Sequence, residues 1–286
     1  MHCTVYERTV YERTCVRAYA CACARVCVCT SVRAYGVRVY LCACVSSSAA
    51  LTMTRCWLEF DVDDQRGAWA RACAFVEACD LRYGFSSKVL SELGGSEKAR
   101  VGECYESDYE WGSKGPIRVT EPGANRVVIE LFEADSPVAC ENFAALCSGS
   151  KGKSGTSGIT LCYRGNRLHR VVRGFVAQGG DITFGNGSGG ESIWGGKKFK
   201  DDKGGLKRKH DSRGIVSMGN SGKNSNSSQF FFCLGPAKAC DGKHVVFGKV
   251  VEGMEVLDLI EAEAREPGSG DENPMREIVI VDCGVL

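Results

Sequence analysis

The sequence from residue 115 to residue 286 predicts a mainly β fold, a closed antiparallel β-barrel, on two observations. Short runs rich in Val, Ile and Phe, such as Arg126–Phe132, are separated by Gly-rich turns. Only two stretches, near 137–149 and 254–264, have apolar residues at helical spacing. Many short strands with few helices favour a barrel, because closure removes the exposed edges of a sheet.

The expected elements follow one another in chain order. Ser136 caps the first helix and Pro137 begins it, since proline suits the first helical position, and this helix ends near Gly149. The second helix begins at Met254 and ends before Pro267. Further strands are expected at Val171–Gln178, Gly214–Met218, Gln229–Leu234, His244–Val250 and Glu277–Val281.

Residues 51–114 are predicted to form a small helical appendage and a linker. Asp63 or Asp64 can cap a helix that Gly84 stops, and apolar residues recur between them at helical spacing. Packing against the main domain is favoured over a partner-binding helix. The acidic and aromatic run Tyr105–Trp111 is expected to be a linker that lies on the barrel. A short second segment carries Val89, Leu90 and Leu93 between Ser86 and Gly94-Gly95.

Residues 1–50 differ in composition from the rest of the chain. Val-Tyr-Glu-Arg-Thr occurs twice, and Val-Cys and Ala-Cys pairs then alternate, a pattern that an alternating nucleotide repeat gives when it is translated. We favour a low-complexity segment that is disordered or artefactual and has no function. Two alternatives stay open, a peptide that targets an organelle and a natural disordered arm.

The composition excludes several classes of protein. The net charge of +1 gives no global field that would recruit nucleic acid or a membrane, and no apolar run reaches the roughly 18 residues of a membrane span. Eighteen cysteines without a CxxC pair indicate neither a disulfide framework nor a zinc site, so no metal is expected. We expect the globular part in a reducing compartment, the cytoplasm or the nucleus.

The segment Leu168–Asp181 is the most informative stretch of the chain. It combines a permanent cation, Arg170, with an amide, Gln178, and a large aromatic ring, Phe175. Side chains alternate faces along a strand, so Arg170 and Gln178 can share one face. Arginine stays charged at any working pH and offers a fixed fork of donors. Beside an apolar pocket, it can stabilise a group that becomes a better acceptor in a transition state.

This segment resembles the signature of the cyclophilin-type peptidyl-prolyl isomerases, which reads Phe-His-Arg, three residues, Gly-Phe, two residues, Gln-Gly-Gly-Asp. Only Leu168 departs from it. Gly214–Phe232 and Asp241–Val250 are similar to the family's next two motifs, in the same order and spacing. The resemblance spans about Gly115–Leu286. It implies eight strands with a helix capping each end, and isomerase activity on X-Pro bonds without any cofactor.

The resemblance also implies the roles of individual residues. Arg170 is the expected catalytic residue, whose cation stabilises the twisted prolyl amide. The proline pocket is assigned to Phe175, Val176, Phe231, Cys240 and His244. The substrate backbone is assigned to Gln178, Asn220 and Gln229, a neighbouring subsite to Gly219 and Ser221, and the rim to Gly187.

Two positions depart from the family pattern. Ala239 stands where a rim tryptophan is usual, and Cys240 where a pocket leucine is usual. We therefore expect weak binding of ciclosporin-type ligands and keep a second reading open, a catalytically weak proline-binding scaffold in a larger complex. An active monomeric isomerase that binds proline-containing peptides and proteins and assists protein folding is the favoured reading.

Two further features leave alternatives open. Cys147 and Cys162 flank an insertion at 151–159 and are either a redox pair or, as we favour, two unrelated thiols. The basic run from Lys197 to His210 is expected to be a solvated loop face rather than a site for an acidic partner or RNA.

Overall fold

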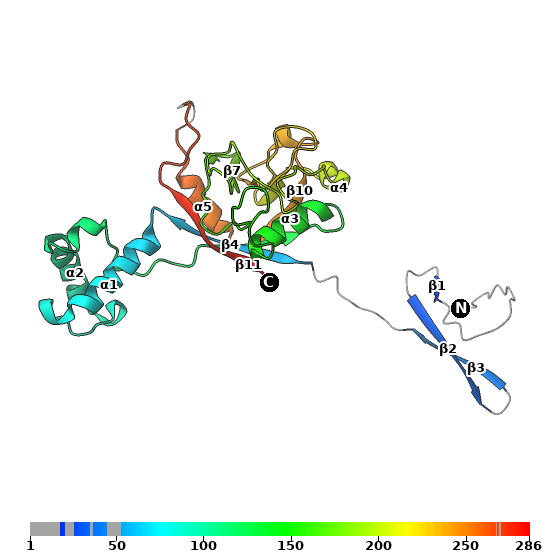
Figure 1. The fold of residues 1–286 in the computed structure, drawn as a ribbon, viewed down its shortest axis with the longest axis horizontal. Helices are drawn as coiled ribbons and strands as arrows, with labels where there is room; N and C mark the ends of the chain where they lie inside the picture. Colours follow the sequence, from blue (N-terminus) through cyan, green and yellow to red (C-terminus); the bar gives the residue numbers. More distant parts are fainter. Residues whose placement is uncertain (1–17, 21–25, 35–36, 45–52, 267, 269) are drawn as a thin grey trace. The chain divides into compact units, whose positions relative to one another are not determined.

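The computed structural model describes residues 18–20, 26–34, 37–44, 53–266, 268 and 270–286, and it separates into two units, 1–52 and 53–286 (Figure 1). In the first unit, β1 (Ala18–Ala20), β2 (Val26–Ala34) and β3 (Val37–Cys44) pair in that order as an antiparallel sheet. These strands differ from the disordered segment that the composition predicts, and their many valines favour extended backbone. The Val-Tyr-Glu-Arg-Thr repeat lies outside the described residues.

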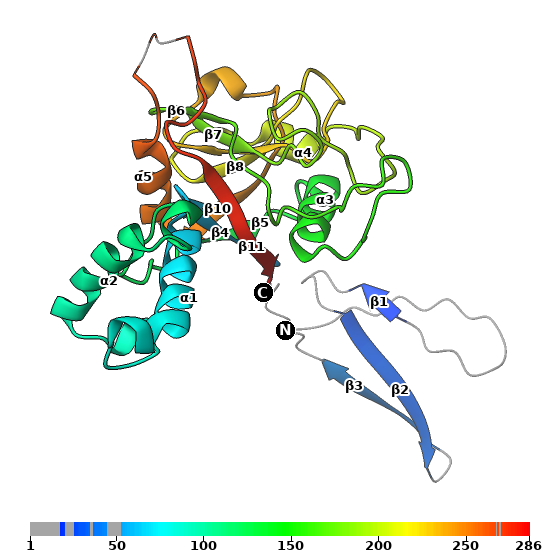
Figure 2. The same ribbon diagram turned by 60° about the vertical axis from the view of Figure 1, so that its left-hand side comes forward.

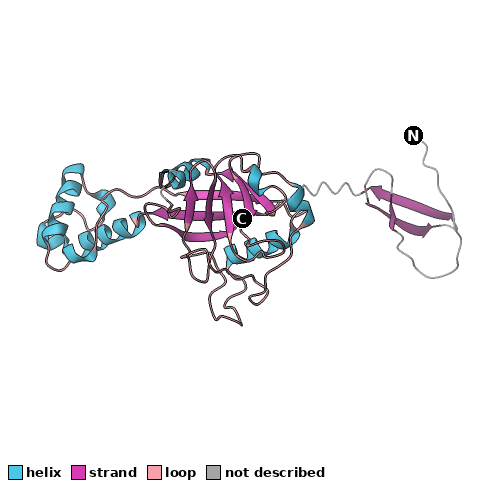
Figure 3. Ribbon diagram, turned by 90° about the horizontal axis from the view of Figure 1, so that it is seen from above, coloured by secondary structure: helices cyan, strands magenta, loops and turns pink. Residues whose placement is uncertain are grey.

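The second unit is built on one antiparallel sheet of eight strands (Figure 3). Their order across the sheet is β11-β4-β5-β10-β8-β9-β7-β6. The strands are β4 (Arg55–Val62), β5 (Arg126–Leu131), β6 (Arg170–Val172), β7 (Val176–Gly179), β8 (Ile215–Met218), β9 (Phe230–Cys233), β10 (Val246–Glu252) and β11 (Ile278–Val285).

The expectation of a closed barrel needs correction, because the sheet is open. Over the described residues, no ladder joins the two end strands, β6 and β11. Strand β6 has three residues, and its Val171 N–H donates to the carbonyl of Glu272, which precedes β11. Just before β6, one isolated bridge, Arg167 to Val279, brings the two ends of the sheet together.

Two helices cover the sheet, and both were predicted. Helix α3 (Pro137–Ser148) begins with its proline and ends at Gly149, whose φ of 64° is left-handed. Helix α5 (Met254–Ala262) buries Val256, Leu257 and Ile260. Phe143 of α3 lies at the centre of the main core, and its ring centroid is 4.9–5.3 Å from those of Tyr163, Phe230 and Phe247. A further short helix, α4 (Lys203–Lys207), was not foreseen within the basic run.

The sheet begins earlier in the chain than the sequence analysis placed it. Strand β4 lies in the segment expected to be a helical appendage, yet it pairs with β5 from Arg55↔Glu130 to Glu59↔Arg126 and with β11. Every second residue of the strand belongs to the main core, as on a sheet with one face on the core: Cys56, Leu58, Phe60 and Val62. The helical segment is therefore an insertion in the β4–β5 hairpin (Figure 2).

This insertion contains two helices and two short 3-10 turns. They are α1 (Gln65–Tyr83), η1 (Leu90–Glu92), α2 (Gly95–Ser107) and η2 (Gly112–Lys114). Gly84 ends α1 in a left-handed conformation, as predicted. Gly95, expected to end a short segment, instead begins α2.

The insertion has a hydrophobic core of its own, separate from the main core. Phe75 lies at its centre, with its ring centroid 5.2 Å from that of Tyr105 and 5.7 Å from that of Trp111. The run Tyr105–Trp111 was expected to be a linker on the barrel, which is wrong, because both aromatic rings pack inside the insertion. Aromatic edge-to-face pairs of this kind add about 0.5–1.5 kcal/mol each beyond area burial.

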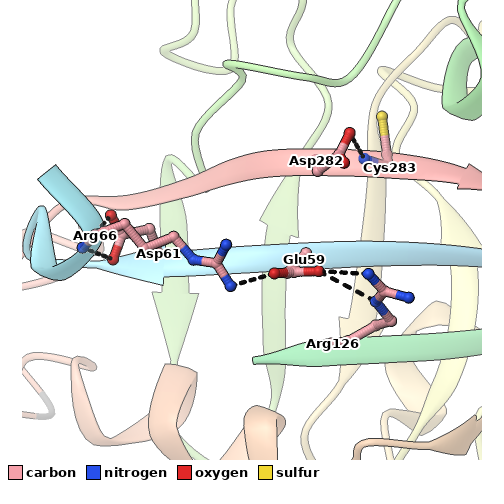
Figure 4. A network of polar contacts seen from close by, with 6 residues as sticks. All are labelled: Glu59, Asp61, Arg66, Arg126, Asp282 and Cys283. Atoms are coloured by element: carbon pink, nitrogen blue, oxygen red, sulfur yellow. Dashed lines mark hydrogen bonds and ion pairs between the residues drawn. The ribbon is translucent and has the colours of Figure 1, made fainter. Parts of the chain in front are cut away.

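An ion cluster joins the insertion to the sheet at its base (Figure 4). Glu59 of β4, a side chain 8% exposed, pairs with Arg66 in the first turn of α1 and with Arg126 of β5, whose Nη2 lies 2.8 Å away. The carboxylate of Asp61 accepts the backbone N–H of Arg66 at 3.1 Å. Asp64 occupies the N-cap position without a side-chain hydrogen bond, so Asp61 supplies the cap that the sequence assigned to Asp63 or Asp64.

The described residues contain neither a membrane-spanning helix nor a metal-ligating cluster. None of their helices is both long and apolar enough to cross a bilayer. They also contain no cluster of three or more His, Cys, Asp and Glu side chains arranged to hold a metal ion.

Candidate proline-binding site

The predicted site residues meet because four strands pair in register. Arg170 of β6 lies opposite Gln178 of β7, Gln178 lies opposite Phe231 of β9, and Phe231 lies opposite Ser217 of β8. Directly paired residues point to the same face of a sheet, so this row places the guanidinium, the amide and the ring on one face. One continuous strand was predicted at Val171–Gln178. The structure gives a hairpin, whose turn contains Gly174 with a φ of 67°.

Strand β9 separates two apolar regions. Phe230 and Phe232 belong to the main core, whereas Phe231 and Cys233 belong to a second cluster on the other face. Alternation along a strand produces this division, and it explains why four consecutive residues of β9 are all buried. The second cluster also contains Val176, Ala237 and Cys240, with Phe175 and Ile215 packed against it.

A cavity of about 180 Å³ opens on this second cluster. Pockets that enclose drug-sized ligands measure about 300–1,000 Å³, so this one suits a single ring rather than a whole peptide. Its lining contains nine of the twelve residues predicted for the site: Arg170, Phe175, Val176, Gln178, Gly219, Asn220, Phe231, Cys240 and His244. Gly187, Ser221 and Gln229 are not part of that lining.

Two imidazole rings hold the ring of Phe231. His244 meets it edge-on at 5.3 Å, and His210 stacks on it at 5.9 Å. The Nδ1 of His244 lies 3.0 Å from the carbonyl oxygen of Met218, to which it can donate. Burial lowers the pKa of His244 despite that bond, so His244 is a neutral wall at pH 7.

A buried polar chain lies beneath Phe231, and the sequence analysis missed it. His210 Nδ1 lies 3.1 Å from a carboxylate oxygen of Asp241, and its Nε2 lies 3.0 Å from Ser217 Oγ. Ser217 and His210 are fully buried, so neither can reach a substrate, and the chain supports the pocket floor. The three residues come from different parts of the chain, only Ser217 lies on a strand, and no spacing in the sequence indicates their contact.

Gln229 acts one step away from the pocket. The amide of Gln178 donates to Gln229 Oε1 at 2.8 Å, and Gln229 Nε2 donates to the carbonyl oxygen of Gly187 at 2.9 Å. Gly187 has a φ of 89°, and a Cβ there would lie 2.7 Å from the ring of His169, so the rim requires glycine. Gln229 and Gly187 thus orient Gln178 rather than line the cavity.

Asn220 and Ser221 follow Gly219, which also lines the cavity. The side-chain amide of Asn220 donates to the carbonyl oxygen of Lys243 at 3.0 Å. This hydrogen bond ties together the two segments that contain Asn220 and Lys243. Ser221 is exposed, and Lys198 Nζ donates to its hydroxyl at 3.1 Å. The subsite predicted beside the pocket is therefore open and flanked by a lysine.

The two departures from the family pattern occupy different places. Ala239 is exposed within the 3-10 turn η3 (Lys238–Cys240) and is not part of the cavity lining. Cys240 is buried in the wall, and burial raises the pKa of its thiol, which therefore stays protonated at pH 7.

Cys147 and Cys162 have different sulfur neighbours, which agrees with the favoured prediction of two unrelated thiols. Cys162 Sγ lies 3.8 Å from Cys283 Sγ, and burial raises the pKa of Cys283 to about 12. Cys147 is fully buried, and burial together with a contact to Cys56 raises its pKa. All ten cysteines in the second unit are free thiols.

One charged neighbour of the pocket was not foreseen. Arg170 Cζ lies 5.9 Å from the centroid of the Phe175 ring, and its Nε lies 2.5 Å from a carboxylate oxygen of Glu272. The pKa of Glu272 is lowered, chiefly by this hydrogen bond. Glu272 lies about a hundred residues from Arg170 in sequence, and no spacing relates the two.

The site is thus a ring-sized cavity with a row of Arg, Gln and Phe on one face of the sheet. A family model for cyclophilin type peptidyl-prolyl cis-trans isomerases (CLD) matches residues 117–285. The chain belongs to this family.

Curated relatives agree with this assignment. The chain is 46% identical over 170 residues to the NK-tumor recognition proteins of Mus musculus and Homo sapiens, which covers 59% of this chain and 11% of theirs. It is 45% identical over 161 residues to peptidyl-prolyl cis-trans isomerase cyp11 of Rhizopus delemar, which covers 56% of this chain and 46% of that protein. The chain thus spans less than half of the length of these relatives.

Proposed function

We propose that this chain catalyses cis/trans isomerisation of X-Pro bonds in peptides and proteins. One observation carries the proposal. A single cavity lined by Phe175, Phe231 and His244 has the guanidinium of Arg170 and the amide of Gln178 on its wall. An apolar slot for a ring, beside a permanent cation, is what a prolyl isomerase needs.

The chemistry requires no nucleophile. Rotation about the bond crosses a barrier of about 18–20 kcal/mol that amide resonance creates. As the amide twists, its nitrogen becomes pyramidal and regains a lone pair. A donor aimed at that nitrogen binds the twisted amide better than the planar one, and this difference is catalysis. Removing about 7 kcal/mol would accelerate the exchange roughly 10⁵-fold.

Each group in the pocket has a part in this mechanism. The second apolar cluster holds the proline ring while the residue before it rotates. The guanidinium of Arg170 supplies the fixed charge, and the amide of Gln178, oriented by Gln229 at 2.8 Å, can bond the substrate backbone. No metal or organic cofactor takes part in any step.

The test is exchange NMR or a protease-coupled assay on a short X-Pro peptide, with Arg170→Ala as the decisive variant. We expect kcat/KM to fall at least about tenfold, a loss of 1.4 kcal/mol or more, with the fold intact. Arg164→Ala is the matched control, because Arg164 has a side chain 64% exposed and pairs with Asp282 away from the pocket. Equal rates for Arg170→Ala and the parent would refute the proposed role.

A second candidate, a proline-binding scaffold with weak turnover, is favoured by the open rim at Ala239 and by the inserted helices. The same peptide discriminates the two. A scaffold binds it in a calorimeter without accelerating its exchange, whereas the isomerase does both.

The wider setting of this activity is also part of the proposal. Free thiols throughout the second unit suit a reducing compartment, the cytoplasm or the nucleus. There a monomeric isomerase would assist the folding of proline-containing proteins. Size-exclusion chromatography would test the monomeric state, and fractionation of cells that express the chain would test the compartment.

A further inference from the structure

The arginine assigned to catalysis lies in a partly exposed position. It belongs to β6, the last strand of the open sheet, and its side chain is 33% exposed. An arginine on an edge strand has many rotamers available, and holding it in one of them has an entropic cost. Accurate catalysis requires the guanidinium to stay beside the ring-sized pocket, because small misplacements of catalytic groups are costly.

Glu272 restrains this side chain. One carboxylate oxygen lies 2.5 Å from Arg170 Nε, and the other lies 3.3 Å from Nη2. The contact is bidentate and charge-assisted, the geometry in which arginine is held most firmly. The remaining nitrogen, Nη1, takes no part in it.

The backbone around Glu272 is itself fixed. Its carbonyl oxygen accepts the N–H of Val171, the residue after Arg170, at 2.8 Å. One residue further on, the carbonyl oxygen of Asn273 accepts from Arg265 Nε at 3.0 Å. The backbone that carries the Glu272 carboxylate is thus bonded to β6 independently of the ion pair.

We propose that Glu272 is a positioning residue for Arg170, which holds the guanidinium at the pocket through Nε and Nη2. This inference rests on the proposed function. It names a carboxylate supplied by the segment before β11 as part of the isomerase site. Among the ion pairs of the described residues, Glu272 is the partner of Arg170.

The opposite effect, a carboxylate that weakens catalysis by screening the cation, is the competing outcome. Glu272 has a side chain 53% exposed, so water reduces its influence on the field in the pocket. The restriction of rotamers does not depend on that screening. We therefore expect Glu272 to favour catalysis more by holding Arg170 in place than it hinders catalysis by screening the charge of Arg170.

The experiment compares Glu272→Ala and Glu272→Gln with the parent in the full chain, by exchange NMR on an X-Pro peptide. Glu272→Ala should lower kcat/KM about five- to tenfold, mainly through kcat, because the slot for the ring is untouched. Glu272→Gln retains an acceptor oxygen and should recover part of the loss. The Arg170 Nε–Hε resonance should shift upfield in both variants.

Glu277→Ala is the matched control. Glu277 lies in the same segment, has a side chain 61% exposed, and pairs with Arg167 at 3.6 Å instead of Arg170. It removes the same charge without touching the pocket, so its kcat/KM should equal that of the parent.

A second comparison separates positioning from general damage. In an Arg170→Ala background, Glu272→Ala should change nothing further, because its partner is gone. An equal loss in both backgrounds would overturn the inference, and so would an unchanged or faster Glu272→Ala enzyme. A parent without activity would reject the proposed function as well, whereas an active parent that is insensitive to Glu272→Ala would reject the inference alone.

Discussion

The open sheet and the inserted helices both bury apolar side chains, but they bring those side chains together in different ways. In the sheet, cross-strand register brings distant residues such as Arg170, Phe231 and Ser217 into one row, and a second apolar cluster remains for a ligand. In the insertion, a contiguous stretch of chain folds around Phe75 into a core of its own. The predicted site lies where long-range pairing builds a cavity, and no residue of the insertion lines that cavity.

The insertion is tolerated because of where it enters. Strands β4 and β5 pair up to Glu59↔Arg126, and the added helices replace what would otherwise be a hairpin turn. Loop length adds little to the cost of closing a connection, and loop tips accept inserted domains readily. The matched family region, residues 117–285, begins after these helices and excludes β4 as well.

The largest effect should come from the core of the insertion. Phe75→Ala removes a fully buried ring and should destabilise the two helices by about 3–5 kcal/mol. Hydrogen exchange would locate the loss in α1 and α2. Isomerase kcat/KM should stay within twofold of the parent, because no pocket residue touches this core. A parallel loss of activity would show that the two regions are coupled.

The sequence predicted the two regions unequally. The resemblance to the cyclophilin-type isomerases placed nine residues that line the cavity, because the motifs that carry it lie on short strands whose turns are marked by glycine. It missed β4, whose partner β5 lies beyond more than sixty residues of inserted chain, so that no short hairpin signal exists. Alternation of Cys56, Leu58, Phe60 and Val62 could have revealed it.

Contacts between loops that are far apart in the chain could not be predicted from the sequence. Glu272 and the chain of His210, Asp241 and Ser217 form only after the sheet has folded. The open barrel has a similar cause, because a three-residue β6 is too short to pair along β11. Local patterns give elements and motifs, whereas the supporting residues of a site come from tertiary contacts.

The next effect tests a departure inside the family region. Ala239→Trp should restore a large ring at the exposed rim and tighten binding of a ciclosporin-type ligand by about 2–3 kcal/mol, or roughly 30- to 150-fold. A proline tetrapeptide, which reaches less of the rim, should gain less. Calorimetry with both ligands makes the comparison. Nanomolar binding by the parent, or no gain in the variant, would show that Ala239 is not at the rim.

A smaller effect is expected where the two regions join. Glu59→Gln removes the charge that holds Arg66 and Arg126, whose side chains are 36% and 46% exposed. Because water already screens both arginines, we expect a loss of only about 1 kcal/mol in the free energy of unfolding. Urea titration would measure it, with Glu252→Gln, 67% exposed and 3.9 Å from Arg55, as the control that should be neutral. If both variants unfold at the same urea concentration, the ion cluster does not stabilise the junction between the insertion and the sheet.

The smallest effect concerns the first unit, whose strands β1 to β3 pair only with one another among the described residues. Deletion of residues 1–50 should leave the melting temperature of the remaining chain unchanged. A loss of 1 kcal/mol would lower it by about 2–4 °C in a domain of this size, so a contribution of that size would be measured. A longer deletion, through residue 58, is the informative contrast. It removes Cys56 and Leu58, which are fully buried in the main core, together with half of β4, and should destabilise the sheet by several kcal/mol. Differential scanning calorimetry of both truncations would locate the point in the chain at which the fold begins. A drop of several degrees in the shorter truncation would mean that the first unit packs against the second, and would move that boundary towards the N-terminus.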